Sequence, residues 1–216
     1  MSADDRIDEA RAASLLRTSA ALRAGADVSD AAFDAHLPRR YRWPSGRHWT
    51  PVAACREAAR WLAPHPDSRV LDVGSGIGKL CVIGSLTTAA TFVGIEQRPH
   101  LVHAARALAA QLGADSASFL SGDAFAADWR EFDSLYFYNP FAEPLFPEPM
   151  RIDLTLPHSE AAHDLAIRRL VDKLAGLPVG ARLVVYHDLG CALPDGYRRV
   201  EQKAVDHSDL ELWLRD

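Results

Sequence analysis

Acidic residues and glycines in the middle of the chain have the spacing of a ligand site. The stretch VLDVGSGIGKL at 70–80 carries Asp72 and then Gly74, Gly76 and Gly78. Glycines let the backbone turn sharply and approach a ligand closely, because they lack a β-carbon. Their spacing differs from the G-x-G-x-x-G dinucleotide loop, and a P-loop is excluded because no GKS or GKT follows. A carboxylate at this loop repels a pyrophosphate and favours a cationic ligand.

Two further acids end the next two predicted strands. Glu96 closes TFVGIE, 22 positions after Gly74 (96 − 74), and Asp123 closes FLSGD. At this spacing the Glu96 carboxylate is suited to accept hydrogen bonds from both hydroxyls of a ribose. Asp123 is suited to accept from the exocyclic amine of adenine, and the Ala124 N–H to donate to the adenine ring. Acids on successive strand ends therefore predict a nucleoside that carries a cationic group.

These residues need a scaffold that brings successive strand ends together. From residue 69 onward, apolar runs typical of strands alternate with helical patterns. The expected strands are 69–73, 91–96, 116–123, 133–140, 181–190, 196–205 and 209–216, and the expected helices are 77–89, 98–114 and 159–178, with a helical turn at 124–129. The alternation implies an α/β fold, a parallel sheet with helices on both faces. The closing strands share only a DHS turn, so the last one must run antiparallel.

The N-terminal part of the chain predicts helices that precede this α/β region. Residues 4–25 alternate charges with Ala and Leu at helical spacing and end in glycine, and a shorter helix follows. We therefore expect an N-terminal helical cap and connector at 1–48 and a ligand-binding domain at 49–216. Thr50 and Pro51 are expected to open a further helix as its N-cap and first residue.

Composition and charge limit the class of protein. No apolar run approaches the roughly 20 residues of a membrane span, and the acidic N-terminus does not resemble a secretory signal. The net charge of −5 argues against a large nucleic-acid footprint. The scattered cysteines lack metal-ligand spacing and predict reduced thiols: Cys55, Cys81 and Cys191. We expect a cytoplasmic protein with no bound metal and no membrane contact.

One local exception to the acidic balance is PRRYRWPSGRHW at 38–49, where arginines alternate with aromatic residues. Two interpretations are open for this segment. Its rings either dock a solvated connector on the domain, or the segment is a lid that attracts an anion.

The runs VLDVGSGIGKL, FVGIEQRP, FLSGDAF and YFYNPF resemble, in order and spacing, the class I S-adenosylmethionine-dependent methyltransferases. The resemblance extends from about Thr50 to the C-terminal hairpin. It implies a Rossmann-like, seven-stranded, mostly parallel sheet whose last strand lies antiparallel between its neighbours. It also implies S-adenosyl-L-methionine as the cofactor.

The resemblance assigns cofactor contacts position by position. The methionine end would lie against Asp72, Gly74, Ser75, Gly76 and Gly78. Relatives with a Thr-Pro entry bring that segment over the methionine, so Thr50 is a further predicted contact beside its capping role.

The adenosine end would be held by Glu96 at the ribose and by Asp123 with Ala124 at the adenine. Gln97 is also a predicted contact, although many relatives have an apolar residue there against the base. This departure makes Phe125 a substitute candidate for stacking on the adenine.

The acceptor side of the site is predicted at Asn139, Pro140 and Phe141, which close the fourth strand. YNPF resembles the Asn-Pro-Pro-aromatic signature of enzymes that methylate planar amino groups, with one proline missing. The resemblance implies that the Asn139 oxygen and the following carbonyl accept hydrogen bonds from the amine, with Asn139 also near the cofactor. Phe141 would stack on the substrate. Alternatively, Asn139 is a turn residue and Phe141 a core anchor.

Three other residues have two interpretations each. Glu143 is a solvated loop acid or contacts the acceptor, and Lys79 is a helix-surface lysine or lies near the cofactor carboxylate. His187 either borders the pocket as a base or has no catalytic role.

The sequence thus favours a methyltransferase acting on a nitrogen, an amino group, of a small molecule or protein. A non-catalytic cofactor-binding module and an O-methyltransferase are the alternatives, and an NAD-dependent oxidoreductase ranks low because of the glycine spacing and Asp123. The arginine-rich segment leaves a nucleic-acid acceptor open, and no oligomeric state is assigned.

Overall fold

A seven-stranded sheet forms the centre of the molecule over the residues that the computed structural model describes, 3–43, 45–141, 143–152, 154–156 and 159–216. The strand order is β3-β2-β1-β4-β5-β7-β6. The strands are β1 (Arg69–Val73), β2 (Thr91–Glu96), β3 (Ala117–Ser121), β4 (Ser134–Phe137), β5 (Arg182–Tyr186), β6 (Tyr197–Val205) and β7 (Ser208–Arg215). The first five are parallel, and β7 lies antiparallel between β5 and β6. The expected Rossmann-like sheet is confirmed.

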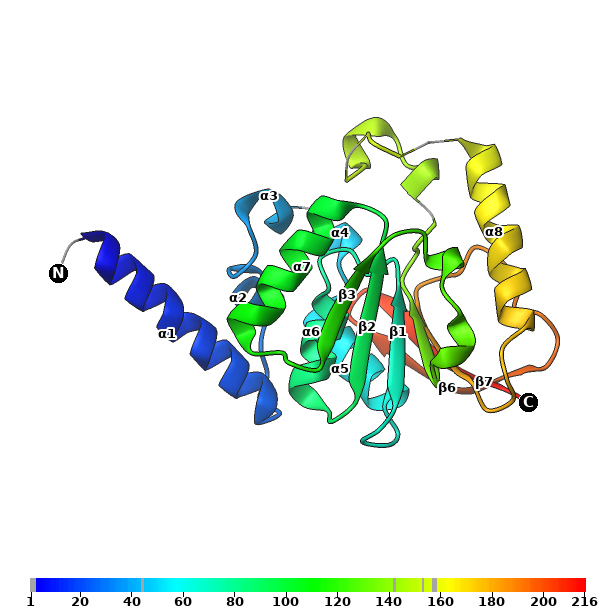
Figure 1. Ribbon diagram of the computed structural model, residues 1–216, viewed down its shortest axis with the longest axis horizontal. Coiled ribbons are helices and arrows are strands. Elements are labelled where there is room, and N and C mark those ends of the chain that lie inside the picture. The colour runs from blue at the N-terminus through cyan, green and yellow to red at the C-terminus, as the bar shows by residue number, and fades with distance from the viewer. Residues whose placement is uncertain (1–2, 44, 142, 153, 157–158) are drawn as a thin grey trace.

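Helices cover both faces of this sheet (Figure 1). The α-helices are α1 (Ala3–Arg23), α2 (Asp30–Asp34), α3 (Arg39–Arg42), α4 (Ser45–His48), α5 (Val52–Leu62), α6 (Lys79–Thr87), α7 (Pro99–Leu112) and α8 (Glu160–Ala175), and the 3-10 turns are η1 (Ala124–Ala126), η2 (Trp129–Glu131), η3 (Glu143–Leu145) and η4 (Glu148–Met150). Within the described ranges, none of these helices has the length and apolar character that crossing a membrane requires.

The hydrophobic core is divided by the sheet into two clusters. Side chains alternate between the faces along each strand, so Val70 and Phe92 join the cluster under α5, α6 and α7. Leu71 and Ile95 join the opposite cluster with Leu170 of α8. The alternation explains why apolar runs without polar interruption predicted these strands correctly, since both faces are buried.

The N-terminal helical segment packs on α6 and α7. Phe33 and Tyr41 belong to the same core cluster as these helices, and Ser19 Oγ donates to the carbonyl of Leu112 at 2.7 Å. Helix α1 extends away from the body of the molecule (Figure 1). The boundary between 48 and 49 stays a prediction.

Three strands are shorter than expected because their C-terminal residues leave the extended conformation. Gly122 follows β3 with φ +157°, Asn139 follows β4 with φ +42°, and His187 follows β5 with φ +78°. A positive φ departs from the extended conformation of a strand. The turns after β3 and β4 lead directly into the cavity residues Asp123 and Pro140.

Thr50 does not cap α5, so that expectation is wrong. Pro51 is the N-cap residue, and the backbone N–H of Val52 donates to Oδ1 of Asp30 at 3.0 Å. The Asp30 carboxylate of α2 therefore accepts the N-terminal hydrogen bond of α5 that was expected for Thr50. The Thr50 hydroxyl is instead bonded to the Tyr136 hydroxyl at 2.9 Å.

Candidate functional site

A cavity of about 410 Å³ opens at the carboxyl ends of the parallel strands. Its volume is in the range of small-molecule sites, roughly 300–1,000 Å³. Of the residues predicted from the sequence, it brings together Gly74, Gly76, Glu96, Gln97, Asp123, Ala124, Asn139, Pro140 and Phe141. Their roles toward a ligand remain predictions.

Four predicted cofactor contacts do not line this cavity. Thr50, Asp72 and Ser75 line a separate space of about 20 Å³ beneath the glycine loop. Gly78 lies at the start of α6 with φ +74°, where a β-carbon would stand 2.3 Å from the Phe119 ring. Its absent side chain therefore serves the packing of the helix on β3.

The glycine loop is held between two other segments. A β-carbon on Gly74 would stand 2.8 Å from Cβ of Pro140, and one on Gly76 would stand 2.6 Å from Cζ3 of Trp49. Both glycines have left-handed backbones, with φ +76° and +55°. The loop thus contacts the Asn-Pro-Phe turn directly. Trp49, which the sequence did not assign to the site, packs over the loop, with its Nε1 donating to the Tyr41 carbonyl at 2.9 Å.

The 38–49 segment combines both of its interpretations. Tyr41 and Trp49 are buried and dock on the domain, whereas Arg47, His48 and Trp49 line the cavity. The Tyr138 hydroxyl fixes this segment by donating to the Arg47 carbonyl at 2.9 Å. The segment is therefore a wall of the site as well as a connector.

Glu96 is buried, and its carboxylate is oriented by the backbone around it. Oε2 accepts from the Gly76 N–H at 3.2 Å, and Oε1 accepts from the Arg98 N–H at 2.9 Å. Oε1 also accepts a longer contact from Arg98 Nη1 at 3.4 Å. A carboxylate has about four acceptor positions, so a further donor in the cavity takes the remaining position or competes with this long contact.

Glu143 is neither a solvated loop acid nor unpaired. Its side chain is buried, bonded through Oε2 to Nη2 of Arg98. Oε1 accepts from the Ile152 N–H at 2.7 Å. Both Arg98 and Glu143 line the cavity, and no local sequence pattern predicts that they meet.

Asp123 makes two contacts of its own. Oδ1 accepts from the Phe125 N–H at 2.9 Å, which starts η1, and Oδ2 pairs with Nη2 of Arg169 on α8 at 2.9 Å. The Arg169 guanidinium also lies 4.3 Å from the centre of the Phe125 ring. Phe141 stacks on the same ring, with centroids 4.9 Å apart. Phe125 is therefore packed by its neighbours, and Phe141 is both a core anchor and part of the cavity wall.

Asn139 combines its two interpretations as well. Its φ of +42° makes it a turn residue, and asparagine tolerates this region better than most side chains. It also lines the cavity beside the glycine loop. Sparsely populated backbone conformations of this kind cluster at functional sites.

Asp72 is buried beside the glycine loop. Burial, helped by the negative charge of Glu96, raises the pKa of Asp72 to about 7, although the Cys81 thiol, which donates to Oδ2 at 3.5 Å, opposes the rise. The carboxyl group is thus poised to change charge near neutral pH, next to a loop that is predicted to hold a cation.

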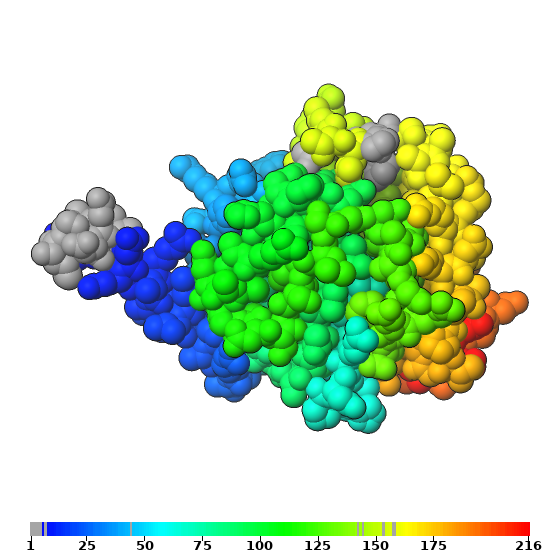
Figure 2. All heavy atoms as spheres, viewed as in Figure 1, coloured from blue at the N-terminus to red at the C-terminus, as the bar shows by residue number. Residues whose placement is uncertain are grey.

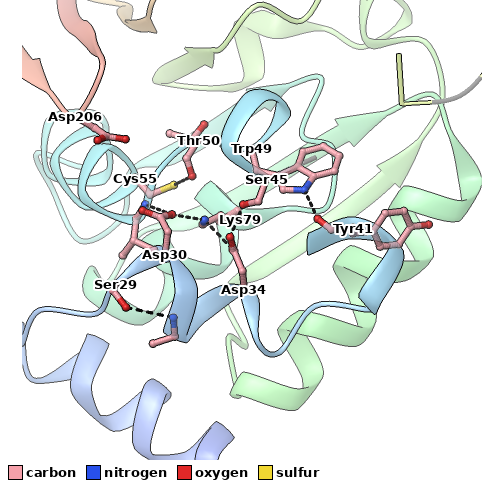
Figure 3. Close-up of polar contacts among 12 residues, drawn as sticks. Ser29, Asp30, Asp34, Tyr41, Ser45, Trp49, Thr50, Cys55, Lys79 and Asp206 are labelled. Atoms are coloured by element: carbon pink, nitrogen blue, oxygen red, sulfur yellow. Dashed lines mark hydrogen bonds and ion pairs between the residues drawn. The ribbon is translucent and has the colours of Figure 1, made fainter. Parts of the chain in front are cut away.

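Lys79 is buried, so its interpretation as a helix-surface lysine is wrong. Its Nζ lies 2.5 Å from Oδ1 of Asp30 and 2.9 Å from Oδ1 of Asp34 (Figure 3). Asp34 also accepts from the Ser45 hydroxyl. The lysine therefore ties the glycine-loop helix to the N-terminal helical segment and does not point to a ligand.

His187 and His163 make structural contacts. Nδ1 of His187 bonds Ser208 Oγ at 2.9 Å outside the cavity, and Nδ1 of His163 bonds the Phe141 carbonyl at 3.0 Å. Among the described residues, no group of three or more His, Cys, Asp or Glu side chains is arranged to hold a metal ion.

Comparisons with known proteins agree with this arrangement. Residues 64–163 match a family model described as a methyltransferase domain. The matched stretch contains the glycine loop, both strand-end acids and the Asn-Pro-Phe turn. No curated protein matches the chain.

Solved structures show the same fold at low identity. A putative methyltransferase, yhhF from Escherichia coli, is 20% identical over 75% of this chain and 85% of its own, with a TM-score of 0.52. TrmN from Thermus thermophilus is 19% identical over 82% and 52%, with a TM-score of 0.58. An O-methyltransferase family 2 protein from Planctomyces limnophilus, in complex with apigenin, is 16% identical over 80% and 58%, with a TM-score of 0.57.

Proposed function

We propose that this protein is a class I S-adenosylmethionine-dependent methyltransferase that methylates an amino nitrogen on a small molecule or a protein. When bound, S-adenosylmethionine supplies an electrophilic methyl group on a sulfonium. Everything else in the reaction is positioning by residues of this chain.

The cofactor contacts that we propose follow the walls of the cavity. Glu96 accepts from the ribose hydroxyls through the acceptor positions that Gly76 and Arg98 leave open. Asp123 accepts from the adenine amine and the Ala124 N–H donates to the ring. Gly74 and Gly76 line the cavity and contact the methionine part with their backbone, while their missing β-carbons make room for Pro140 and Trp49.

The preference for nitrogen depends on Asn139. Its left-handed turn lies at the end of β4, and the adjacent Pro140 is in contact with the glycine loop. A carboxamide oxygen and the next backbone carbonyl are hydrogen-bond acceptors only, so they suit an acceptor that presents N–H groups. An amine held this way directs its lone pair at the methyl carbon, and such orientation can contribute about 7–11 kcal/mol toward the barrier.

The proposal is tested by transfer of a radiolabelled methyl group from S-adenosylmethionine to pools of small molecules, proteins and nucleic acids. We expect label in the first two pools, as a methylamine that survives mild base. Label on a carboxyl or hydroxyl oxygen would contradict the nitrogen assignment, and label in the nucleic-acid pool alone would contradict the acceptor class.

Asn139→Gly is the matched variant, because glycine adopts the left-handed turn without strain. We expect it to bind S-adenosylhomocysteine as the wild type does and to lose about tenfold or more in turnover, the effect of one lost transition-state hydrogen bond. Unchanged turnover would remove Asn139 from the reaction. Asn139 is the only asparagine in the chain, so selective ¹⁵N-asparagine labelling reports the state of this one carboxamide when ligands bind.

A further inference from the structure

A buried chain of charges connects the predicted ribose acid to the loop that follows the Asn-Pro-Phe turn. Glu96 at the end of β2 contacts Nη1 of Arg98 at 3.4 Å, and Nη2 of the same guanidinium is bonded to Glu143. Glu143 belongs to η3, 45 positions away from Arg98 in the sequence (143 − 98). One arginine thus joins a residue predicted to bind the cofactor to a segment on the acceptor side.

Burial makes this connection strong. The side chains of Glu96, Arg98 and Glu143 are only 5%, 6% and 11% exposed. Charges removed from water interact strongly, and removing one partner leaves another charge uncompensated. Two carboxylates share one guanidinium, so a change at either acid alters how the arginine is divided between them.

Glu143 in turn fastens the loop at 143–152 against the cavity. Its Oε1 accepts from the Ile152 N–H at 2.7 Å, which closes the loop across its base. Ile152 lines the cavity and packs on the hydrophobic core. His48 makes a second attachment by bonding the Met150 carbonyl at 2.8 Å. Figure 2 shows this yellow-green loop at the edge of the molecule, next to α8 in yellow.

We propose that Arg98 and Glu143 are positioning residues that couple cofactor binding to the closure of the 143–152 loop over the acceptor site. Ribose hydroxyls donate to Glu96 and compete there with the long contact from Arg98 Nη1. The guanidinium is then held more by Glu143, which stabilises the loop in its closed position. The acceptor therefore binds against the 143–152 loop after cofactor binding has stabilised the closed position of that loop.

The coupling rests on the proposed function, because it requires that Glu96 is the ribose acid. It is reciprocal, as every binding linkage is: a loop held closed raises cofactor affinity as much as the cofactor stabilises the loop. Neither residue needs to touch the reacting atoms.

Hydrogen exchange of the full chain, with and without saturating S-adenosylhomocysteine, tests the coupling. In the wild type we expect the ligand to slow exchange over 143–152 by at least about fivefold, the lower end of typical couplings. Glu143→Gln keeps the shape of the side chain and loses its charge. By the same reciprocity we expect this variant to bind the ligand about fivefold more weakly than the wild type and to show little ligand-dependent protection of the loop.

Glu148→Gln is the control, since Glu148 is exposed in the same loop. It should behave as the wild type in both measurements. If Glu143→Gln does not fold, Glu143→Asp keeps the charge but is too short to span both partners, and it should lose the ligand-dependent protection in the same way. The measured quantity is the difference in loop exchange with and without the ligand. A purely structural effect of the Glu143 substitution changes exchange equally in both states and drops out of this difference.

Two outcomes overturn the proposal. Ligand-dependent protection that persists in Glu143→Gln would show that the arginine does not carry the coupling, and a wild type that binds the ligand without protecting the loop would show that there is none. Calorimetry distinguishes these two outcomes from failure of the cofactor assignment. If the wild type binds no S-adenosylhomocysteine, both the proposed function and the coupling are wrong.

Discussion

Asp123 and Arg169 form an ion pair at the cavity, with Oδ2 and Nη2 2.9 Å apart, although 46 positions separate them in the sequence (169 − 123). Arg169 reaches from α8 across the Phe125 ring to the end of β3. The acid predicted to read the adenine amine is therefore already occupied by an arginine. Glu96 is likewise in contact with Arg98. Asp123 is thus balanced by a distant helix, whereas Glu96 is balanced by an arginine two residues away.

Replacing Arg169 should strengthen cofactor binding. Both side chains are about half exposed, 44% and 50%, so their pairing is worth at most about 1 kcal/mol. Arg169→Gln frees Asp123 for the adenine amine, and we expect calorimetry to show S-adenosylhomocysteine binding up to about fivefold tighter. Arg168→Gln, an exposed change on the same helix, should leave the affinity unchanged. Weaker binding in Arg169→Gln would mean that the arginine contacts the ligand instead of competing with it.

Glu96→Gln should weaken S-adenosylhomocysteine by about ten- to a hundredfold, corresponding to about 1.5–3 kcal/mol for hydrogen bonds to a charged acceptor. Glutamine is preferable to alanine because it fills the same buried space beside Arg98. The dissociation constant from calorimetry is the measurement, and Glu131→Gln on the surface is the control. Equal affinities for the wild type and Glu96→Gln would end the ribose assignment.

Gly76→Ala should destabilise the fold by about 1–3 kcal/mol. Its β-carbon would stand 2.6 Å from the Trp49 ring, and the residue has φ +55°, so the substitution adds overpacking to backbone strain. Denaturant unfolding gives the free energy directly. The control is Gly46→Ala, where a β-carbon meets nothing within 4 Å. A Gly76→Ala variant as stable as the control would show that Trp49 can move away from the loop freely.

Stability should fall with rising pH because of Asp72. Its folded pKa of about 7 lies above the ordinary value of 3.8, so the folded state binds the extra proton. The stabilisation is complete below about pH 4 and is lost as the pH rises to about 7. Between pH 5.5 and pH 8 we expect the wild type to lose about 2 kcal/mol of unfolding free energy relative to Asp72→Asn, which mimics the protonated side chain. Parallel stability curves for the two proteins would contradict the raised pKa.

The strands that carry the site were predictable because their signals are local. β1 and β2 have the predicted bounds, 69–73 and 91–96, since a buried strand needs only a short apolar run followed by a turn. The glycines follow β1, Glu96 ends β2 and Asp123 lies just beyond β3, so the parallel arrangement alone brings them to one edge of the sheet. Predictions for isolated side chains fared worse: Lys79 is buried and Thr50 does not cap α5.

Taken alone, the sequence determined the order of the strands along the chain, the glycine loop and which acids stand at strand ends. Tertiary structure decided which charges meet: Arg169 with Asp123, Arg98 with Glu143, and Lys79 with the acids of α2. It also decided that Trp49 covers the loop. A strand or a turn depends on neighbours within a few residues, whereas an ion pair depends on two distant segments packing together. No local pattern encodes that meeting.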